Sequence, residues 1–374
     1  MKFSVLSSAL SSHLQMISRV INPKSPLPIL DKFLFTLEGK RLTLTAADME
    51  TMMQTFIDLD SAEGSGSVAL GSKLLLDTLK EFGDMPLEFN VEDGTLATSI
   101  KSESGVYNLV AEDGSEYPKM RTLGDGANQL TLSTEVLNMG LNRTVFATAD
   151  DENRPSMNGI YFDITMNDLT FVGSDAQKLS CMRTISARGE QDCGFILPKK
   201  PTNLLRAISP KVGGNLQVKF DDKNAVFTFE NYVMVCRLQE GKYPNYKTVI
   251  PQNNPYKVTV DRVSLLNTLR RISIFSNQAL NLVKVELQPN RMTVSAQDID
   301  FSISATEDLV CSYDGDPMKI GFNSTLLVEI LSNLPCDEVV LELADPSRAG
   351  LVVPLAQDEN AETRMLVMPM MLND

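Results

Sequence analysis

The chain contains one histidine, His13, so any catalytic site that needs an imidazole base depends on that residue alone. Ser-His-Asp and Cys-His arrangements both require such a base. His13 lies in a segment whose apolar residues recur at helical spacing, where a surface or capping role is the commoner one. The sequence also lacks the GxSxG, SxxK, GxGxxG and GxxxxGKS patterns of nucleophile elbows, dinucleotide turns and phosphate loops. We therefore expect no catalytic residues.

Acidic side chains gather at residues 150–152, at Asp298 with Asp300, and at Asp345. A two-metal nuclease would need such carboxylates to converge on a divalent ion. The first group lies in the polar segment ADDENRP, which is typical of a solvated loop. Asp298 has equivalents elsewhere in the chain and is more simply a turn residue that binds its own backbone. We therefore expect no metal and no cofactor.

The five cysteines are odd in number, widely scattered and without a CxxC pair. This pattern argues against a disulfide framework and against a structural zinc site. We expect all five to be small core residues in a reducing compartment. The N-terminus lacks a continuous apolar region and a small-residue cleavage site, so we expect a cytoplasmic protein.

The C-terminal segment RMLVMPMMLND crowds four methionines around Pro369. Met365–Val367 suit a last strand that packs into a core, but a proline followed by apolar residues cannot continue in a central strand. We expect the final residues to form an exposed apolar lip. Methionine is flexible and recurs at surfaces that accept several apolar partners, so this lip indicates a peptide-binding groove.

The elements that position these residues repeat three times along the chain. Segments beginning at Lys2, Gln129 and Lys257 each open with an alternating strand and continue with a helical pattern. In a second register, strand, turn, strand is followed by Asp48, Asp175 or Asp298, and the triplets EGK, MND and QPN suit hairpin turns.

A third register begins at the segments VALGSKLLLDTLKEF, FILPKKPTNLLRAIS and MKIGFNSTLLVEILSNL. Each predicts a strand, a capping turn at Ser72, Pro198 or Asn323, and an amphipathic helix. The predicted fold class is α+β, with antiparallel sheets and six helices in three tandem domains. The linker-like segments LGDGANQ and PQNNP place these domains at residues 1–125, 126–252 and 253–374.

A net charge of −14 argues against nucleic-acid binding unless the cations are segregated. The six predicted helices with their flanks carry a net charge of +7, and the rest of the chain carries −21. If all helices line one surface, that surface is basic and could hold phosphates without reading bases. The alternative is that Lys and Arg are simply good helix formers on solvated faces.

Several motifs, in order and within the triple repeat, resemble one family over the whole chain. They are MKFSV at the start, PLPIL at Pro26–Leu30, LTLTAADME at Leu42–Glu50, NGIYF at Asn158–Phe162, GKYPNY at Gly241–Tyr246, IGFN at Ile320–Asn323 and VMPM near the end. The chain resembles the bacterial DNA polymerase III beta subunits, the sliding clamps. The resemblance implies DNA-clamp domains with sheets outside and two helices each inside, and a head-to-tail homodimeric ring around double-stranded DNA. It also implies a non-catalytic processivity factor that an ATP-driven clamp loader opens and loads.

The resemblance further implies that the DNA polymerase III alpha subunit and other polymerases or repair proteins dock in one shared groove through short linear peptides. Carried over by position, this predicted groove is lined by Met157, Ser174, Ala176, Lys178, Leu179, Pro244, Val249, Leu366, Met368, Pro369 and Met370. The residues expected to face DNA are Lys24 and Arg154, by resemblance, and the helix cations Lys199, Lys200, Arg206, Arg270 and Arg271.

The chain departs from the family pattern at three places. It has Ala176-Gln177-Lys178-Leu179 where the family commonly has Gly-His-Arg-Leu, Met371 where an Arg is usual, and Pro155-Ser156 where aromatic residues are frequent. These departures affect the peptide preference of the groove and some contacts with DNA. Two other hypotheses stay open from the sequence: a metal-dependent nuclease that uses the acidic groups, and a repeat scaffold that binds peptides but never DNA.

Overall fold

The computed structural model describes residues 1–372 as two compact units, each formed from separate stretches of the chain. The first unit holds residues 1–134 and 203–238, and the second holds residues 135–202 and the chain from residue 239 onward. The expected middle domain, residues 126–252, is therefore divided between the two units. Each compact unit contains all the strands of its own two sheets. The bounds of the three expected domains stay a prediction.

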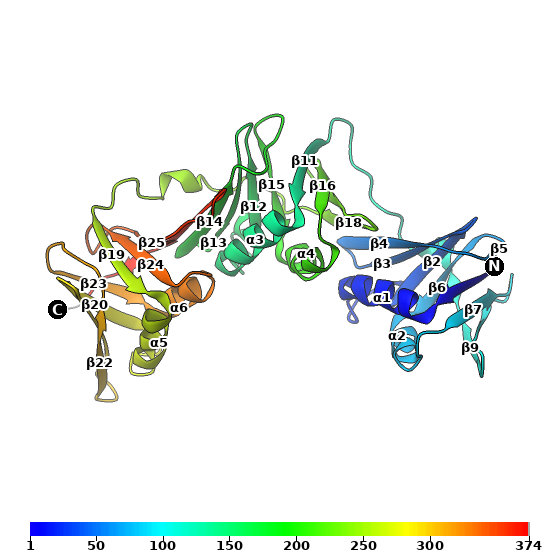
Figure 1. The fold of residues 1–374 in the computed structure, drawn as a ribbon, viewed down its shortest axis with the longest axis horizontal. Coiled ribbons are helices and arrows are strands. Elements are labelled where there is room, and N and C mark those ends of the chain that lie inside the picture. The colour runs from blue at the N-terminus through cyan, green and yellow to red at the C-terminus, as the bar shows by residue number, and fades with distance from the viewer. Residues whose placement is uncertain (373–374) are drawn as a thin grey trace. The chain divides into compact units, whose positions relative to one another are not determined.

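The first unit contains two antiparallel sheets, with the orders β5-β1-β7-β8-β9 and β10-β6-β2-β3-β4-β18-β17-β16-β11 (Figure 1). The strand bounds are β1 Lys2–Leu6, β2 Lys32–Glu38, β3 Arg41–Ala47, β4 Thr51–Asp58, β5 Ala62–Glu63, β6 Gly66–Gly71, β7 Pro86–Val91, β8 Ala97–Lys101, β9 Val106–Val110, β10 Glu112–Asp113, β11 Asn128–Ser133, β16 Asn215–Phe220, β17 Asn224–Thr228 and β18 Tyr232–Arg237.

The second unit has the same plan, with the sheet orders β15-β12-β13-β14-β26-β25-β24-β19 and β22-β21-β20-β23-β27. The strand bounds are β12 Gly159–Ile164, β13 Leu169–Ser174, β14 Lys178–Thr184, β15 Cys193–Pro198, β19 Tyr256–Asp261, β20 Leu282–Gln288, β21 Arg291–Asp298, β22 Ile303–Val310, β23 Met318–Asn323, β24 Glu338–Leu343, β25 Gly350–Pro354, β26 Ala361–Val367 and β27 Pro369–Met370.

Each long sheet joins strands from two neighbouring repeats. In the first unit β18 pairs with β4, from Tyr232 opposite Thr55 to Cys236 opposite Thr51. In the second unit β26 pairs with β14 along the whole length of β14. The expected repeat of strand, helix and further strands is confirmed, and the sheets continue across the expected domain boundaries.

Each helix follows directly after a strand, as the repeat predicts. The described residues contain α1 Ser7–Ile17, α2 Ser72–Lys80, α3 Thr134–Thr144, α4 Lys199–Val212, α5 Arg262–Ser273 and α6 Ser324–Ser332. Leu10, Leu14 and Ile17 are fully buried, so the helical spacing of α1 does define a core face. Burial of each such side chain contributes roughly 1.5–3 kcal/mol.

The predicted capping turns are confirmed at one of three positions. Asn323 caps α6, because its side chain accepts hydrogen bonds from the backbone N–H of Thr325 and Leu326. Ser72 is instead the first residue of α2, and Gly71 occupies the N-cap without a side-chain bond. Pro198 is the last residue of β15. A cap that the sequence reading missed is Asp261, which accepts from the N–H of Ser264 at the start of α5.

The repeated aspartates are turn residues, as predicted. Asp48 Oδ1 accepts from the backbone N–H of Glu50 and Thr51 at 2.8 and 2.6 Å. Asp298 Oδ1 accepts from Asp300 and Phe301 at 3.0 and 3.3 Å. The EGK and QPN hairpins are also confirmed, with Glu38 opposite Arg41 and Gln288 opposite Arg291.

The core of the second unit lies between its sheets and the helices α5 and α6. It joins residues of β19, β24, β25 and β26 to residues of β20, β21 and β23. Cys181, Cys236 and Cys311 are buried, as expected, whereas Cys193 and Cys336 are only half-buried. No helix among residues 1–372 is long and apolar enough to cross a membrane.

Candidate functional site

The turn between β13 and β14 positions the centre of the predicted groove. Asp175 Oδ1 accepts from the backbone N–H of Gln177 and Lys178 at 2.9 and 2.8 Å. Ser174 Oγ donates to the carbonyl of Lys178 at 2.9 Å and accepts from the N–H of Ala176 at 3.2 Å. Ala176 has φ 73°, in the left-handed region, so this tight turn holds a strained residue at the site.

Lys178 is a buried cation with two carboxylate partners. Its side chain is 7% exposed, and its Nζ lies 2.6 Å from Asp175 Oδ2 and 2.9 Å from Glu329 Oε2 on α6. Burial alone would lower the pKa of Lys178, but the two carboxylates outweigh burial and raise that pKa above its ordinary value. The ammonium group therefore ties the β13–β14 turn to α6.

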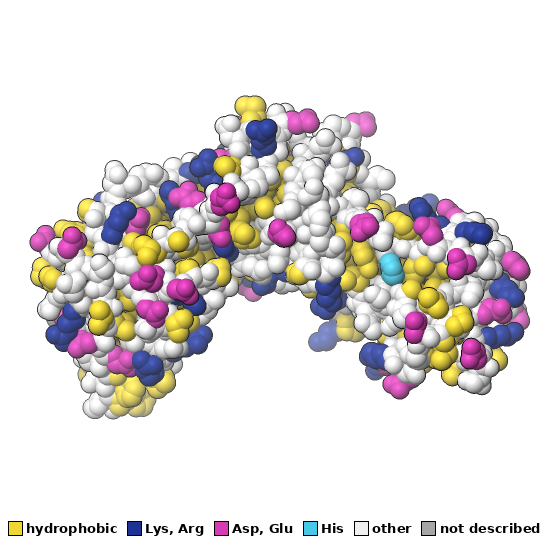
Figure 2. Space-filling model, viewed as in Figure 1, with side chains coloured by type: hydrophobic (Ala, Val, Ile, Leu, Met, Phe, Trp, Pro, Cys, Tyr) yellow, Lys and Arg dark blue, Asp and Glu magenta, His cyan; other side chains and the backbone are white. Residues whose placement is uncertain are grey.

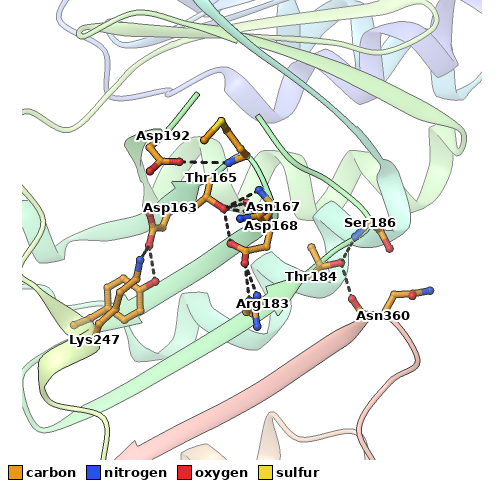
Figure 3. A network of polar contacts seen from close by, with 12 residues as sticks. Asp163, Thr165, Asn167, Asp168, Arg183, Thr184, Ser186, Asp192, Lys247 and Asn360 are labelled. Carbon is orange, nitrogen blue, oxygen red and sulfur yellow. Dashed lines mark hydrogen bonds and ion pairs between the residues drawn. The ribbon is translucent and has the colours of Figure 1, made fainter. Parts of the chain in front are cut away.

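A segment that we call the strap, residues 239–255, crosses the sheet that contains β12–β14. Tyr243 stacks on Tyr161 with 4.9 Å between ring centroids. The Tyr246 hydroxyl donates to Asp163 Oδ2 at 2.6 Å, and Lys247 Nζ lies 2.8 Å from the same oxygen (Figure 3). Burial and then the hydrogen bond to Asp163 raise the pKa of Tyr246. These anchors were missed as site residues, although GKYPNY was noted as a motif.

The strap anchors belong to a larger polar network on the same sheet. Arg183 donates from Nε to Asp168 Oδ2 at 2.8 Å, and Thr165 Oγ1 donates to Asp168 Oδ1 at 3.0 Å (Figure 3). Asp168 in turn raises the pKa of Arg183. These hydrogen bonds link the ends of β12, β13 and β14 beneath the strap.

The C-terminal segment passes from one sheet of the second unit to the other. Leu366 on β26 is buried opposite Leu179 on β14. At Met368 the chain leaves that sheet, and the Met368 N–H donates to the carbonyl of Gln177 at 3.1 Å. Pro369 and Met370 then form β27 at the edge of the other sheet, beside β23. The expectation that Pro369 excludes a central strand is confirmed.

The residues of the predicted groove range from buried to exposed, with Pro369 and Met370 half-buried and Ala176 exposed. Met157, Ser174, Lys178, Leu179 and Leu366 are buried. On the surface, Val249 is 54% and Met368 is 44% exposed, Pro244 is also exposed, and Met371, outside the predicted set, is 78% exposed. The structure joins Ser174, Lys178, Leu179, Leu366 and Met368 through strand pairing and hydrogen bonds. Met157 lies in a separate turn, Pro155–Met157.

Several cations expected to face DNA are already paired with acidic residues. Lys199 Nζ lies 3.2 Å from Asp150, and Arg154 Nε lies 3.7 Å from Asp151. Two acids of the segment at residues 150–152, Asp150 and Asp151, therefore pair with cations of the same chain. Arg271 pairs with Glu307 at 2.6 Å. Arg206 and Arg270 donate hydrogen bonds to the side chains of Asn203 and Ser332. Lys24 lies in an exposed turn, and Lys200 lies in the first turn of α4.

Other chemistry finds little support in the part of the chain that the structure describes. Within residues 1–372, no three His, Cys, Asp or Glu side chains lie together in a way that could hold a metal ion. His13 Nδ1 lies 2.6 Å from Thr55 Oγ1, and its ring stacks on Tyr232. Burial lowers the pKa of His13. His13 is therefore packed against β4 and β18.

Comparison with known protein families decides the identity. The models of the N-terminal, central and C-terminal domains of the DNA polymerase III beta subunit match residues 1–121, 131–245 and 247–371. The chain belongs to the DNA polymerase III beta subunit family. Beta sliding clamps from Synechococcus elongatus and Pseudomonas putida are 28% and 25% identical to it, with all of each chain covered.

Solved structures of DNA polymerase III beta subunits have the same fold. The subunit from Pseudomonas aeruginosa is 24% identical with a TM-score of 0.93, and the alignment covers all of both chains. The sliding clamp from Bartonella birtlesii, solved bound to griselimycin, is 26% identical with a TM-score of 0.89, again over all of both chains. The expected fold class of three tandem clamp domains is confirmed.

Proposed function

We propose that this chain is a DNA sliding clamp, a non-catalytic processivity factor that holds a DNA polymerase on duplex DNA. The observation that carries the proposal is the succession of three DNA polymerase III beta domains over residues 1–371, in a chain whose fold matches solved clamps end to end. The relatives are bacterial proteins named beta sliding clamp, so we place the protein in the cytoplasm, with the chromosome. Membership in a family of non-catalytic clamps argues against the nuclease hypothesis.

The ring is proposed to be a homodimer closed head to tail. One sheet of the first unit ends at β9, and one sheet of the second unit ends at β22, each with a single neighbouring strand among the described residues. Unpaired strand edges are templates for pairing with another chain. Pairing of β9 in one copy with β22 in the next would satisfy both edges and would close when the last copy meets the first.

Duplex DNA is proposed to be held by enclosure and by weak, sequence-independent contacts with phosphates. The helix cations and their neighbours supply these contacts: Lys24, Arg154, Lys199, Lys200, Arg206, Arg270 and Arg271. The ion pairs of Lys199, Arg154 and Arg271 reduce the positive charge that is free for phosphate. Such a surface suits a protein that slides, because tight phosphate binding would hold it in place.

Retention on circular DNA tests the ring directly. After loading by a clamp loader, the protein should stay on a nicked circle and leave when that circle is linearised. A gel-filtration assay with labelled protein measures the fraction retained on each form. Equal retention on circular and linear DNA would overturn enclosure and would favour a protein that binds peptides or DNA without a ring.

Partner proteins, including the polymerase III alpha subunit and the clamp loader, are proposed to dock through short peptides on the predicted groove. The proposal is supported by the exposed apolar side chains of Pro244, Val249 and Met368 and by the hydrogen-bonded turn that positions Lys178. The griselimycin complex of the Bartonella birtlesii clamp supports the view that this fold accepts ligands. Removal of residues 368–374 should abolish peptide binding and leave the dimer intact.

A matched pair of point variants sharpens this test. Val249 and Leu355 are 54% and 53% exposed, and both belong to the second unit. Val249→Asp should weaken binding of a polymerase C-terminal peptide by about 30-fold or more, because it places a charge in the apolar contact. Leu355→Asp should leave affinity unchanged. Fluorescence anisotropy measures both, and equal affinities for the two variants would refute the assignment of the groove.

A further inference from the structure

Two adjoining hollows lie on one face of the eight-stranded sheet in the second unit. Their volumes are about 470 and about 830 Å³, and Gln252, Glu362 and Arg364 line both. On β26, Leu366 packs with the strap, whereas the neighbouring Met365 packs with α5 and α6. Side chains alternate between the two faces of a strand, so Glu362 and Arg364 lie on the face that carries the strap. The residues that line the hollows lie outside the predicted groove.

The smaller hollow is bordered by two ion pairs whose cations point to solvent and whose carboxylates lie deeper. The Lys247 side chain is 62% exposed, and its partner Asp163 is 14% exposed. Arg183 is 52% exposed, and its partner Asp168 is 12% exposed. Figure 3 shows both pairs beside the strap. A ligand at this surface therefore meets positive charge first and negative charge at longer range.

The larger hollow continues this arrangement. Lys257 is 66% exposed, and its partner Glu342 is 23% exposed. Where the hollows meet, Arg364 and Glu362 pair and are about equally exposed, at 40% and 38%. The cations run across the sheet from the strap and β14 through β26 to β19. We call these four cations the basic row: Lys247, Arg183, Arg364 and Lys257.

The guanidinium groups of the basic row keep donors for a ligand. Arg183 directs Nε and Nη2 at Asp168 Oδ2, over distances of 2.8 and 2.6 Å. Arg364 directs the same two nitrogens at Glu362 Oε1, over 2.7 and 2.5 Å. A guanidinium has five N–H donors, and these contacts leave those on Nη1 for another acceptor. Each arginine can therefore hold its own carboxylate and donate to a second one.

One acidic residue opposes the basic row. Asp192 is exposed at the smaller hollow, where the N–H of Met166 donates to it at 3.4 Å. The whole chain is acidic, with net charge −14, and on the face drawn in Figure 2 Lys and Arg side chains are scattered among Asp and Glu. Four outward cations over adjoining hollows are therefore a local feature, and Asp192 should weaken the binding of an anion there.

The floor of the hollows is apolar and long enough for a short extended segment. Ile250 lines the smaller hollow, and Leu351 and Val353 line the larger one. The strand order β14-β26-β25-β24-β19 separates Arg183 from Lys257 by four strand spacings, or about 19 Å at about 4.8 Å each. An extended chain rises about 3.3 Å per residue, so about six residues span this distance.

We propose that the two hollows form a docking site for an extended acidic segment of a partner protein. Carboxylates of the segment bind the basic row, and its apolar side chains pack on the floor. Charge complementarity excludes a basic segment, and the aliphatic floor favours a peptide over a nucleic acid, whose backbone would leave that floor bare. The site lies apart from the predicted groove and depends neither on the groove nor on the ring.

Fluorescence anisotropy on the full chain tests the site with a labelled six-residue peptide of alternating glutamate and leucine. The peptide should bind at about 50 mM NaCl, and its dissociation constant should rise at least about fivefold at about 300 mM NaCl, because salt screens exposed charges. A peptide with glutamine in place of glutamate should bind at least about tenfold more weakly, since it offers neutral acceptors.

Point variants locate the binding on the basic row. Arg364→Gln and Lys257→Gln should each weaken binding about tenfold, whereas Asp192→Asn should strengthen it about twofold. Arg41→Gln is the matched control, because Arg41 is 55% exposed and pairs with Asp58 in the first unit. These four side chains are exposed or half-buried, so the melting temperatures of the variants should stay close to that of wild type.

The outcomes separate this site from the predicted groove. Equal binding of the glutamate and glutamine peptides would overturn recognition of charge, and an equal loss with Arg41→Gln and Arg364→Gln would overturn the location. A six-nucleotide oligothymidylate that binds more tightly than the peptide would assign the row to phosphates instead. Displacement of the probe by a polymerase C-terminal peptide would place the probe in the groove, whereas continued binding would support a separate site.

Discussion

Replacement of Lys178 by Met tests whether the buried ion pairs hold the groove together. Breaking a fully buried ion pair by removing one partner costs about 3–5 kcal/mol, because a charge is left without compensation. The Lys178 side chain is 7% exposed, whereas the side chains of Asp175 and Glu329 are 21% and 42% exposed, so water partly screens the carboxylates left behind. We therefore expect a loss of about 2 kcal/mol, discounted for solvent screening.

Differential scanning calorimetry should report this loss as a fall of about 4–8 °C in the transition of the second unit. Lys257→Met is the control, because Lys257 is 66% exposed in its pair with Glu342 in the same unit and should cost under about 0.5 kcal/mol. A double-mutant cycle should show that adding Glu329→Gln to Lys178→Met lowers the free energy of unfolding little further, because the ion pair is already broken. Equal melting temperatures for Lys178→Met and Lys257→Met would refute the reasoning.

Two further predictions concern His13 and the helix caps. Burial lowers the pKa of His13 below 6.5, so the unfolded chain binds a proton more readily than the folded chain and stability is lost as the pH falls below that value. Between about pH 7.5 and about pH 5.5, the melting temperature of His13→Gln should therefore fall less than that of wild type. Parallel curves of melting temperature against pH would contradict this. Chemical denaturation should show that Asn323→Ala and Asp261→Ala each lower the free energy of unfolding by about 1 kcal/mol. The control Thr325→Ala, at an exposed position, should leave that free energy nearly unchanged. Equal losses for all three variants would exclude capping.

Much of the fold could be predicted because it depends on local patterns. Leu10, Leu14 and Ile17 are spaced as one helical face, and all three are fully buried. Asp48 and Asp298 bind backbone groups two or three residues ahead, so their turns follow from a few residues of sequence. Such features need no knowledge of distant parts of the chain.

What could not be predicted depends on contacts between distant residues. Lys178 was expected to line the groove, but its partner Glu329 comes from α6, so its burial is not visible in the sequence around it. The strap anchors Tyr246 and Asp163 are also far apart along the chain. Ser72 failed as a cap because Gly71 takes the N-cap position, a difference of one residue that propensity does not resolve.

The sheets shared between repeats restrict how the number of repeats could change. A fragment that ended at the strap would lose β26 and leave β14 as a bare edge along its whole length. A fragment that ended before β18 would expose β4 in the same way. Bare edges of this length promote aggregation, so loss or gain of a single repeat is costly to the folded chain.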